Sequence, residues 1–195
     1  MKEGLTHQSI LISIGPIKIR GDNVNIVGER VYFRAVELED KELLLEMMND
    51  EETEHNLGGW SFPTSNLNQE EWIRSIRNEA NILRCIIVHK EEQLSLGTII
   101  LTDIDYKNGN AEIHIKLSKQ VRSKGYGVES IRLLTCYAFE ELRLHCIYAH
   151  VNSYNNASIK LFEKCGFSKE GILRDRIFKQ GNYHGIYSYS LLKGD

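Results

Sequence analysis

The chain lacks any long apolar segment. A membrane-spanning helix needs about 20 consecutive apolar residues, and no run in the 195 residues approaches that length. The apolar stretch from Ser9 to Ile14 is too short for the core of a signal peptide and has no cleavage site. We therefore expect no membrane partner and a cytoplasmic location.

The chain also lacks an excess of either charge. Its 24 Lys and Arg residues are scattered among 27 Asp and Glu residues, which leaves a formal net charge of -3. Proteins that bind nucleic acid usually gather basic residues into a patch that faces the phosphates. The sequence contains no such patch, so we expect no nucleic acid partner.

Cysteines are few, and their spacing fits no metal site. They form neither a C-x-x-C pair nor another zinc-ligand spacing; the four are Cys85, Cys136, Cys146 and Cys165. Each has apolar neighbours in the sequence, which is typical of reduced thiols in a core. We expect no metal.

Apolar residues are plentiful, at 42% of the chain, and are sufficient for one core without disulfides or a metal. We predict a single domain over residues 29–195. Residues 1–28 contain three short β-type runs separated by the turn signals Gly15-Pro16 and Gly21-Asp22-Asn23. This pattern predicts an accessory N-terminal hairpin or arm.

Hydrophobic periodicity predicts a sheet whose strands are antiparallel at first and later include a parallel pair. The expected strands are 31–34, 82–89, 96–105, 111–117, 144–151 and a pair that meets at Gly181-Asn182. The expected helices are 40–48, 127–142 and 155–165. A further helix is expected to have Asn68 as its N-cap and Trp72, Ile73 and Ile76 as its apolar stripe. Strands 82–117 form an antiparallel meander, whereas the later strand-helix-strand order requires a parallel pair. The sheet is therefore expected to be mixed.

The most informative segment is QVRSKGYG, residues 120–127, between strand 111–117 and an amphipathic helix. Gly125 and Gly127 let the backbone approach a bulky phosphate, and the helix that follows adds the positive end of its dipole. A diphosphate fits this arrangement, with Arg122 and Lys124 as supplementary charges. The Walker loop and the dinucleotide fingerprint do not match. Taken alone, the segment is equally compatible with a glycine-rich turn that only starts a helix.

A second segment, residues 152–167, is by itself an Asn-capped helix that ends at Gly166. Together, however, the two segments resemble the GNAT superfamily of N-acetyltransferases, through the motifs Arg122-x-x-Gly125-x-Gly127 and Asn152-x-x-Asn155-x-x-Ser158. The resemblance covers roughly Val31 to Lys193. The C-terminal part is most similar to the branch of ribosomal-protein N-terminal (Rim-type) and spermidine acetyltransferases.

The resemblance implies an α+β fold with a mixed, mostly antiparallel central sheet of about seven strands, a splayed parallel pair at its centre and helices on both faces. It implies acetyl-CoA as co-substrate, with pantetheine in the gap between strands 111–117 and 144–151. The cofactor-binding residues that it implies are Ile115, Leu117, Arg122, Ser123, Lys124, Gly125, Tyr126, Gly127, Asn152, Asn155 and Ser158.

The implied reaction is the direct attack of a primary amine on the thioester in a ternary complex. It requires a base for the ammonium proton, a donor for the oxyanion and an acid for the thiolate. Strand alternation places Glu112 and His114 on one face, with Glu112 as the first candidate base and His114 as the competing one. A backbone amide near Ile115 or Leu117 is expected to bind the oxyanion.

The acid for the thiolate is less defined. Many relatives carry a tyrosine where this chain has Phe162, which has no proton to give. Ser158 or Asn155 then orients the thiol, Tyr154 supplies a hydroxyl, or water takes the role.

The acceptor pocket of this family lies between the region of the first two helices and the C-terminal hairpin. The candidates here are His55, Trp60, Phe62 and Tyr183, with residues 58–63 as a lid. The acceptor is a small-molecule amine such as a polyamine, or a peptide N-terminus, and a homodimer is common in this branch. Two alternatives stay open: a non-catalytic acyl-CoA-binding regulatory module, and an acetyltransferase for an antibiotic or an amino sugar.

Overall fold

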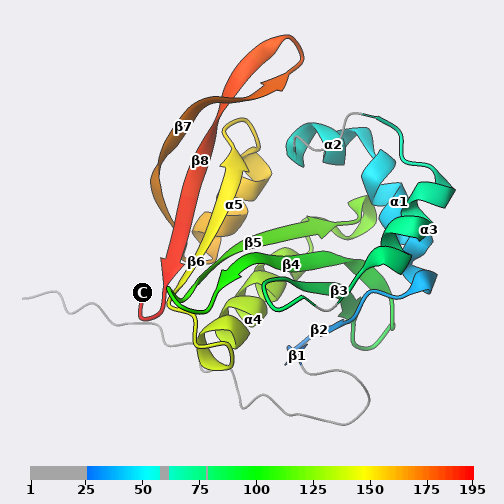
Figure 1. Ribbon diagram of the computed structural model, residues 1–195, viewed down its shortest axis with the longest axis horizontal. Coiled ribbons are helices and arrows are strands. Elements are labelled where there is room, and N and C mark those ends of the chain that lie inside the picture. The colour runs from blue at the N-terminus through cyan, green and yellow to red at the C-terminus, as the bar shows by residue number, and fades with distance from the viewer. Residues whose placement is uncertain (1–25, 58–61, 78) are drawn as a thin grey trace, which may run out of the picture.

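A computed structural model describes residues 26–57, 62–77 and 79–195 of the chain (Figure 1). The expected N-terminal hairpin or arm lies outside the described residues except at its end, where Ile26 and Val27 form strand β1 and pair with β2.

The described residues form a single eight-stranded sheet with five α-helices. The strands are β1 (Ile26–Val27), β2 (Val31–Arg34), β3 (Leu83–His89), β4 (Ser95–Asp105), β5 (Asn110–Leu117), β6 (Cys146–Asn152), β7 (Ser168–Lys179) and β8 (Asn182–Leu192). The helices are α1 (Lys41–Asn49), α2 (Glu51–Leu57), α3 (Asn66–Ser75), α4 (Tyr126–Glu140) and α5 (Asn156–Lys164), and short 3-10 turns cover Leu38–Asp40 and Lys119–Val121.

The sheet is mixed, as expected. Its strand order is β1-β2-β3-β4-β5-β6-β8-β7, and every neighbouring pair is antiparallel except β5 and β6, which are parallel. The count is eight rather than about seven because the two-residue β1 adds to the edge.

Helices cover both faces of the sheet, which confirms the predicted architecture (Figure 1). Strand alternation divides β3 between the two layers. Ile87 belongs to the core beneath α4, with Ile131 and Leu134, whereas Ile86 belongs to a second cluster with Leu44 of α1 and Ile73 of α3.

The parallel pair separates shortly after it begins. Asn110, Ala111 and Glu112 pair with residues 146–148, and the pairing then stops although both strands continue. The expected splay is therefore present, and it opens the sheet between Ile113–Leu117 and the second half of β6.

One local prediction was wrong, and one short helix was missed. The N-cap of α3 is Ser65, whose hydroxyl accepts a hydrogen bond from the amide of Asn68, so Asn68 lies inside the helix. Helix α2 was not predicted, since EETEHNL has one apolar residue and no helical stripe.

Candidate active site

Two pockets meet at the opening between β5 and β6. Pocket A, of about 570 Å³, lies between α1, α3, the face of β4 and β5, and the end of β6. Pocket B, of about 820 Å³, lies between α2, the loop before α4 and the first turn of α5. Six residues line both, and we call them the junction: Asn56, Leu57, Ile115, Lys116, Asn155 and Ser158.

The backbone of β5 presents free amides to this opening. The amide of Ser118 donates to Leu96 of β4, and successive amides of a strand point to opposite sides. The amides of Ile115 and Leu117 therefore face the β6 side, where the ladder has ended. These are the two positions from which the sequence predicts an oxyanion donor and bonds to pantetheine.

The loop before α4 has the geometry expected of an anion site. Ser123 (φ 62°) and Gly125 (φ 88°) both adopt the left-handed region, and Gly125 is the N-cap of the 15-residue helix α4. The first amides of a helix have no partner within it and carry the positive end of the dipole. Lys119, Lys160 and Lys164 also line pocket B, so its chemistry fits the diphosphate of acetyl-CoA.

Arg122 lines pocket B, but its side chain is held by protein groups. Its Nη2 donates to Thr53 Oγ1 at 2.6 Å and lies 3.4 Å from Asp50 Oδ2, while Nη1 lies 3.1 Å from Glu52 Oε2. Its Nε donates to the carbonyl of Leu117 at 3.2 Å. The Thr53 hydroxyl, together with its amide and Arg122, holds the pKa of Asp50 below its usual value. Arg122 thus ties α2 to the end of β5.

Two other residues of the loop segment make contacts that the sequence did not predict, and of these Gly127 also lines pocket B. A Cβ at Gly127 would lie 3.3 Å from the Leu161 side chain, so this glycine allows α4 and α5 to pack closely. The ring of Tyr126 faces away from pocket B, with the Arg30 guanidinium 4.9 Å from its centre. Arg30 also donates to the carbonyl of Lys124 and pairs with Glu129. Sequence reasoning missed Arg30, which braces the loop from outside.

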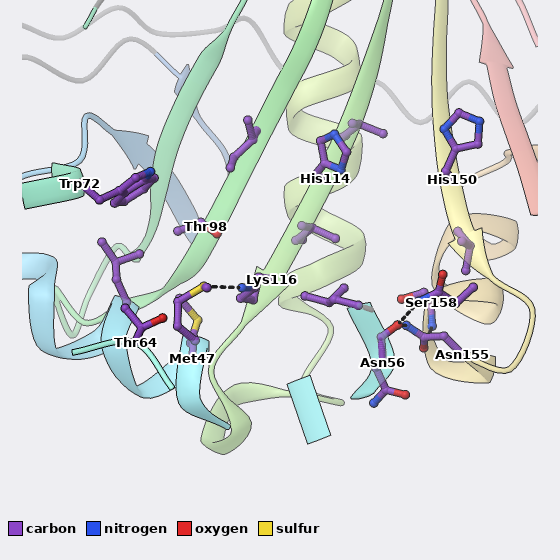
Figure 2. Close-up of a pocket in the computed structure, with 18 of the residues that line it drawn as sticks. Met47, Asn56, Thr64, Trp72, Thr98, His114, Lys116, His150, Asn155 and Ser158 are labelled. Carbon is purple, nitrogen blue, oxygen red and sulfur yellow. Dashed lines mark hydrogen bonds between the residues drawn. The ribbon is translucent and has the colours of Figure 1, made fainter. Parts of the chain in front are cut away.

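The face of β5 toward pocket A carries Glu112, His114 and Lys116, as alternation predicts. His114 and Lys116 line the pocket, whereas Glu112 does not. Glu112 Oε1 lies 2.9 Å from Nδ1 of His150 on β6, and His150 does line the pocket. Figure 2 shows His114 and His150 on opposite sides of the opening. His150 had no signal in the sequence, because its partner comes from another strand.

Lys116 is a largely buried amine at the junction. Its Nζ lies 3.4 Å from Sδ of Met48, a weak acceptor (Figure 2). Burial lowers the pKa of Lys116. No carboxylate is present among the described residues that line pocket A, so Lys116 supplies the only formal charge there apart from the two titratable histidines.

The predicted asparagines hold the backbone of α2. Asn152 and Asn155 both donate to the carbonyl of Asn56, at 2.9 and 3.1 Å, and Asn155 Oδ1 caps α5 by accepting from the amide of Ser158. Asn152 lines pocket A, whereas Asn155 and Ser158 lie at the junction. Tyr154 donates its hydroxyl to the carbonyl of His55.

Phe162 is buried beneath the junction, where it lines pocket A and packs edge-on against Phe167. It offers no proton donor there, in agreement with the sequence. Ser158 is thus the predicted residue with a hydroxyl that lies where both pockets meet.

The three predicted acceptor residues that the structure describes, His55, Phe62 and Tyr183, do not line pocket A. Phe62 and Tyr183 are each 67% exposed, and neither lines pocket A. His55 packs against Tyr154 on the far side of α2, outside both pockets. Trp60 and most of the expected lid lie outside the described residues. The structure places Trp72, Thr98 and Met47 at pocket A instead.

The described residues contain neither a membrane-spanning helix nor a cluster of metal ligands. No helix among them is long and apolar enough to cross a membrane. They contain no group of three His, Cys, Asp or Glu side chains arranged to hold a metal ion.

The sequence is similar to known N-acetyltransferases over most of its length. It is 34% identical over 167 residues to the uncharacterized N-acetyltransferase p20 of Bacillus licheniformis, covering 85% of this chain and 94% of that protein. It is 26% identical over 169 residues to the spermidine N(1)-acetyltransferase of Vibrio cholerae, covering 86% and 95%.

The fold is similar to solved structures of the same kind. The spermidine N-acetyltransferase of Vibrio cholerae, in complex with CoA and spermine, matches with a TM-score of 0.77 and 25% identity, covering 84% of this chain and 95% of that one. Residues 30–168 match the model of the acetyltransferase (GNAT) domain. With the splayed strands and the loop before α4, this match shows that the chain belongs to the GNAT acetyltransferase family and is an acetyl-CoA-dependent N-acetyltransferase.

Proposed function

We propose that this enzyme transfers an acetyl group directly from acetyl-CoA to a primary amine, with acetyl-CoA in pocket B and the acceptor in pocket A. The observation that carries the proposal is the junction, where the two pockets meet beside the unpaired amides of β5. A thioester placed there is open to an amine from the opposite side. The protein then needs to hold both reactants in line and to stabilise the oxyanion.

Each part of pocket B has a role in this proposal. The first amides of α4, with the lysines of the pocket, would hold the diphosphate, and the amides of Ile115 and Leu117 would bond pantetheine and the developing oxyanion. Ser158 would orient the sulfur from the first turn of α5.

The acceptor that pocket A fits best is a peptide N-terminus. Its polar lining is mainly amide and hydroxyl, from residues such as Asn68, Gln69 and Thr98, beside apolar walls of Met47 and Trp72. These groups suit a backbone with one amine. A polyamine brings several positive charges, for which the described lining offers Lys116 and no carboxylate, and like charges in a half-buried site repel by several kcal/mol.

A matched pair of acceptors tests this. CoA release is followed with a thiol reagent, using acetyl-CoA with either Ala-Ala-Ala amide, which has one amine, or spermidine. We expect acceptor-dependent release, with kcat/KM for the peptide at least about tenfold higher, equivalent to about 1.4 kcal/mol. A preference for spermidine would contradict the acceptor assignment alone. Tight acetyl-CoA binding by calorimetry without release for any amine would contradict direct transfer.

Two properties of the whole protein are part of the proposal. The four cysteines are free thiols in the structure, which supports a reducing compartment such as the cytoplasm. We also propose a homodimer, which sedimentation of the purified protein would test.

A further inference from the structure

The carboxylate first favoured as the base does not reach the lining of pocket A. Glu112 is 15% exposed in its side chain and does not line pocket A. It lies on the last paired rung of β5 and β6, opposite Tyr148. Its Oε1 reaches across to His150, the next residue on that face of β6, at 2.9 Å from Nδ1. Glu112 is therefore engaged by a residue that does line the pocket.

This contact determines which nitrogen of the neutral His150 imidazole carries the proton. An ionised carboxylate only accepts hydrogen bonds, so Nδ1 of His150 is the donor. In the neutral ring, the other nitrogen, Nε2, then carries the lone pair. A carboxylate that fixes a ring in this way also stabilises the imidazolium formed when Nε2 takes a proton.

His114 is less suited to the same task. Its Nε2 lies 2.9 Å from Oγ1 of Thr102 and 3.8 Å from Glu112 Oε2. This nitrogen is thus already engaged with a hydroxyl on β4, and the carboxylate is beyond hydrogen-bond distance.

We propose that His150 is the catalytic base of the acetyl transfer and that Glu112 is its positioning residue. This inference rests on the proposed function, since it requires the acceptor amine in pocket A. His150 stands on the β6 side of the opening (Figure 2), and the amides of Ile115 and Leu117 face the opening from the β5 side. The base and the oxyanion donors thus flank the junction.

The acetyl transfer removes two protons from the acceptor nitrogen. The acceptor ammonium gives one proton to Nε2 of His150, and the free amine attacks the thioester carbonyl, forming a C–N bond. The C–S bond then breaks, the second nitrogen proton passes to the departing thiolate, and His150 returns its proton to solvent. Glu112 stays ionised throughout, so no further reactant is needed.

The groups around His150 include a carboxylate that favours its imidazolium and positive groups that oppose it. Glu112 lies on the Nδ1 side, His114 lies beyond Glu112, and the Tyr148 ring packs edge-on at 5.7 Å. On β8 the paired residue is the neutral Ser188. Lys116 lies across pocket A and opposes a second positive charge there.

Substitutions at the two histidines test the proposal with Ala-Ala-Ala amide as acceptor. His150→Asn keeps a donor for Glu112 but has no base, and we expect kcat/KM to fall by about 10²–10⁴-fold. The ascending limb of the pH–rate profile between about pH 5 and 8 should disappear with it. His114→Asn changes the other histidine that lines pocket A and is the matched comparison. We expect it to lower kcat/KM less than His150→Asn does and to keep the ascending limb of the wild-type pH–rate profile.

Glu112→Gln separates the positioning residue from the base. We expect a smaller loss than for His150→Asn, an ascending limb that is still present, and no further loss when Glu112→Gln is added to His150→Asn. If Glu112→Gln alone removes the limb, or if the two losses multiply, Glu112 is the base and the proposal is wrong.

A measurement without turnover keeps the two proposals apart. Long-range ¹H–¹⁵N NMR of the labelled enzyme should show neutral His150 protonated at Nδ1, with loss of the Nδ1 hydrogen bond in Glu112→Gln. Protonation at Nε2 would overturn the assignment of His150 even if acetyl transfer is found. Absence of CoA release with every amine, by contrast, would count against the proposed function alone.

Discussion

At the scale of single residues, Lys116 is the least expected feature of the site. An amine taken out of water without an anionic partner costs free energy unless it loses its proton. The structure places Lys116 at the junction, where its hydrogen-bond partner among the described residues is the Met48 thioether. The position of Lys116 at the junction therefore lowers the stability of the folded protein, as is common for residues at functional sites.

The cost of burying Lys116 is measurable as a pH dependence. In the unfolded chain the amine deprotonates near its usual pKa of 10.5, and in the folded protein burial lowers that pKa. Between the two values the unfolded chain binds more protons, so the free energy of unfolding rises with pH there. Below that window the full penalty is present.

Lys116→Met should therefore stabilise the protein at pH 7, with a gain that shrinks as the pH approaches 10.5. In a protein of this size, about 1 kcal/mol corresponds to about 2–4 °C in Tm. Thermal unfolding at pH 7 and pH 10 checks this, with the exposed Lys107→Met as control. An equal change at both pH values would show that the ammonium carries no penalty.

At the scale of elements, α2 links the two pockets. Four hydrogen bonds hold this short helix: Asp50 accepts from the Thr53 amide at 2.8 Å, Arg122 donates to the Thr53 hydroxyl, and Asn152 and Asn155 both donate to the carbonyl of Asn56. All of these are polar contacts made between segments far apart in the sequence or at a cap. Hydrophobic periodicity therefore could not predict α2, although it predicted α1 and α4 within a few residues.

The same reason explains the gaps in the predicted site. The Gly125 loop and the Asn155 cap are local patterns, so their place beside the splay was predictable from sequence. His150 and Arg30 were not, because each acts through a residue on another element, Glu112 and Glu129 respectively. Tyr183 was expected in the acceptor pocket but does not line pocket A. The length of a hairpin does not show where its tip lies.

Helix α2 also carries an acidic residue into pocket B. Glu52 lines this pocket and pairs with Arg122 at 3.1 Å. A diphosphate bound there would be repelled by this carboxylate and would compete with it for Arg122. We expect Glu52→Gln to lower the Kd of acetyl-CoA severalfold at low salt, an effect that salt should weaken because Glu52 is exposed.

Calorimetric titration with acetyl-CoA measures this effect. The control is Glu51→Gln, which removes the same charge from an exposed position of the same helix that does not line pocket B. An equal change in both variants would indicate a general field effect, and an unchanged Kd in Glu52→Gln would place the diphosphate elsewhere.

At the scale of the whole molecule, the β7–β8 hairpin extends beyond the other strands, and its tip bends toward α2 (Figure 1). Lys179, at the end of β7, forms an ion pair with Glu54 of α2, and the two side chains are only 13% and 24% exposed. The C-terminal hairpin is thereby connected to the helix that borders both pockets.

Removing this connection should loosen α2. We expect Lys179→Met to speed amide hydrogen exchange over residues 51–57 while the exchange of β3 and β4 stays unchanged, because those strands are largely buried and do not adjoin the β7–β8 hairpin in the sheet. The exposed Arg176→Met on the same hairpin is the control. Unchanged exchange in α2 would mean that the asparagine and Arg122 contacts hold it alone.

The junction has a consequence for molecules larger than either substrate. Six residues line both pockets, so in the proposed arrangement the reacting ends of an amine and of CoA would lie within one continuous cavity. A single compound that joined the acceptor to the CoA sulfur would occupy both pockets and would lose its freedom of translation only once. Such a conjugate could bind far more tightly than its separate halves, because the second half would arrive at a high effective concentration.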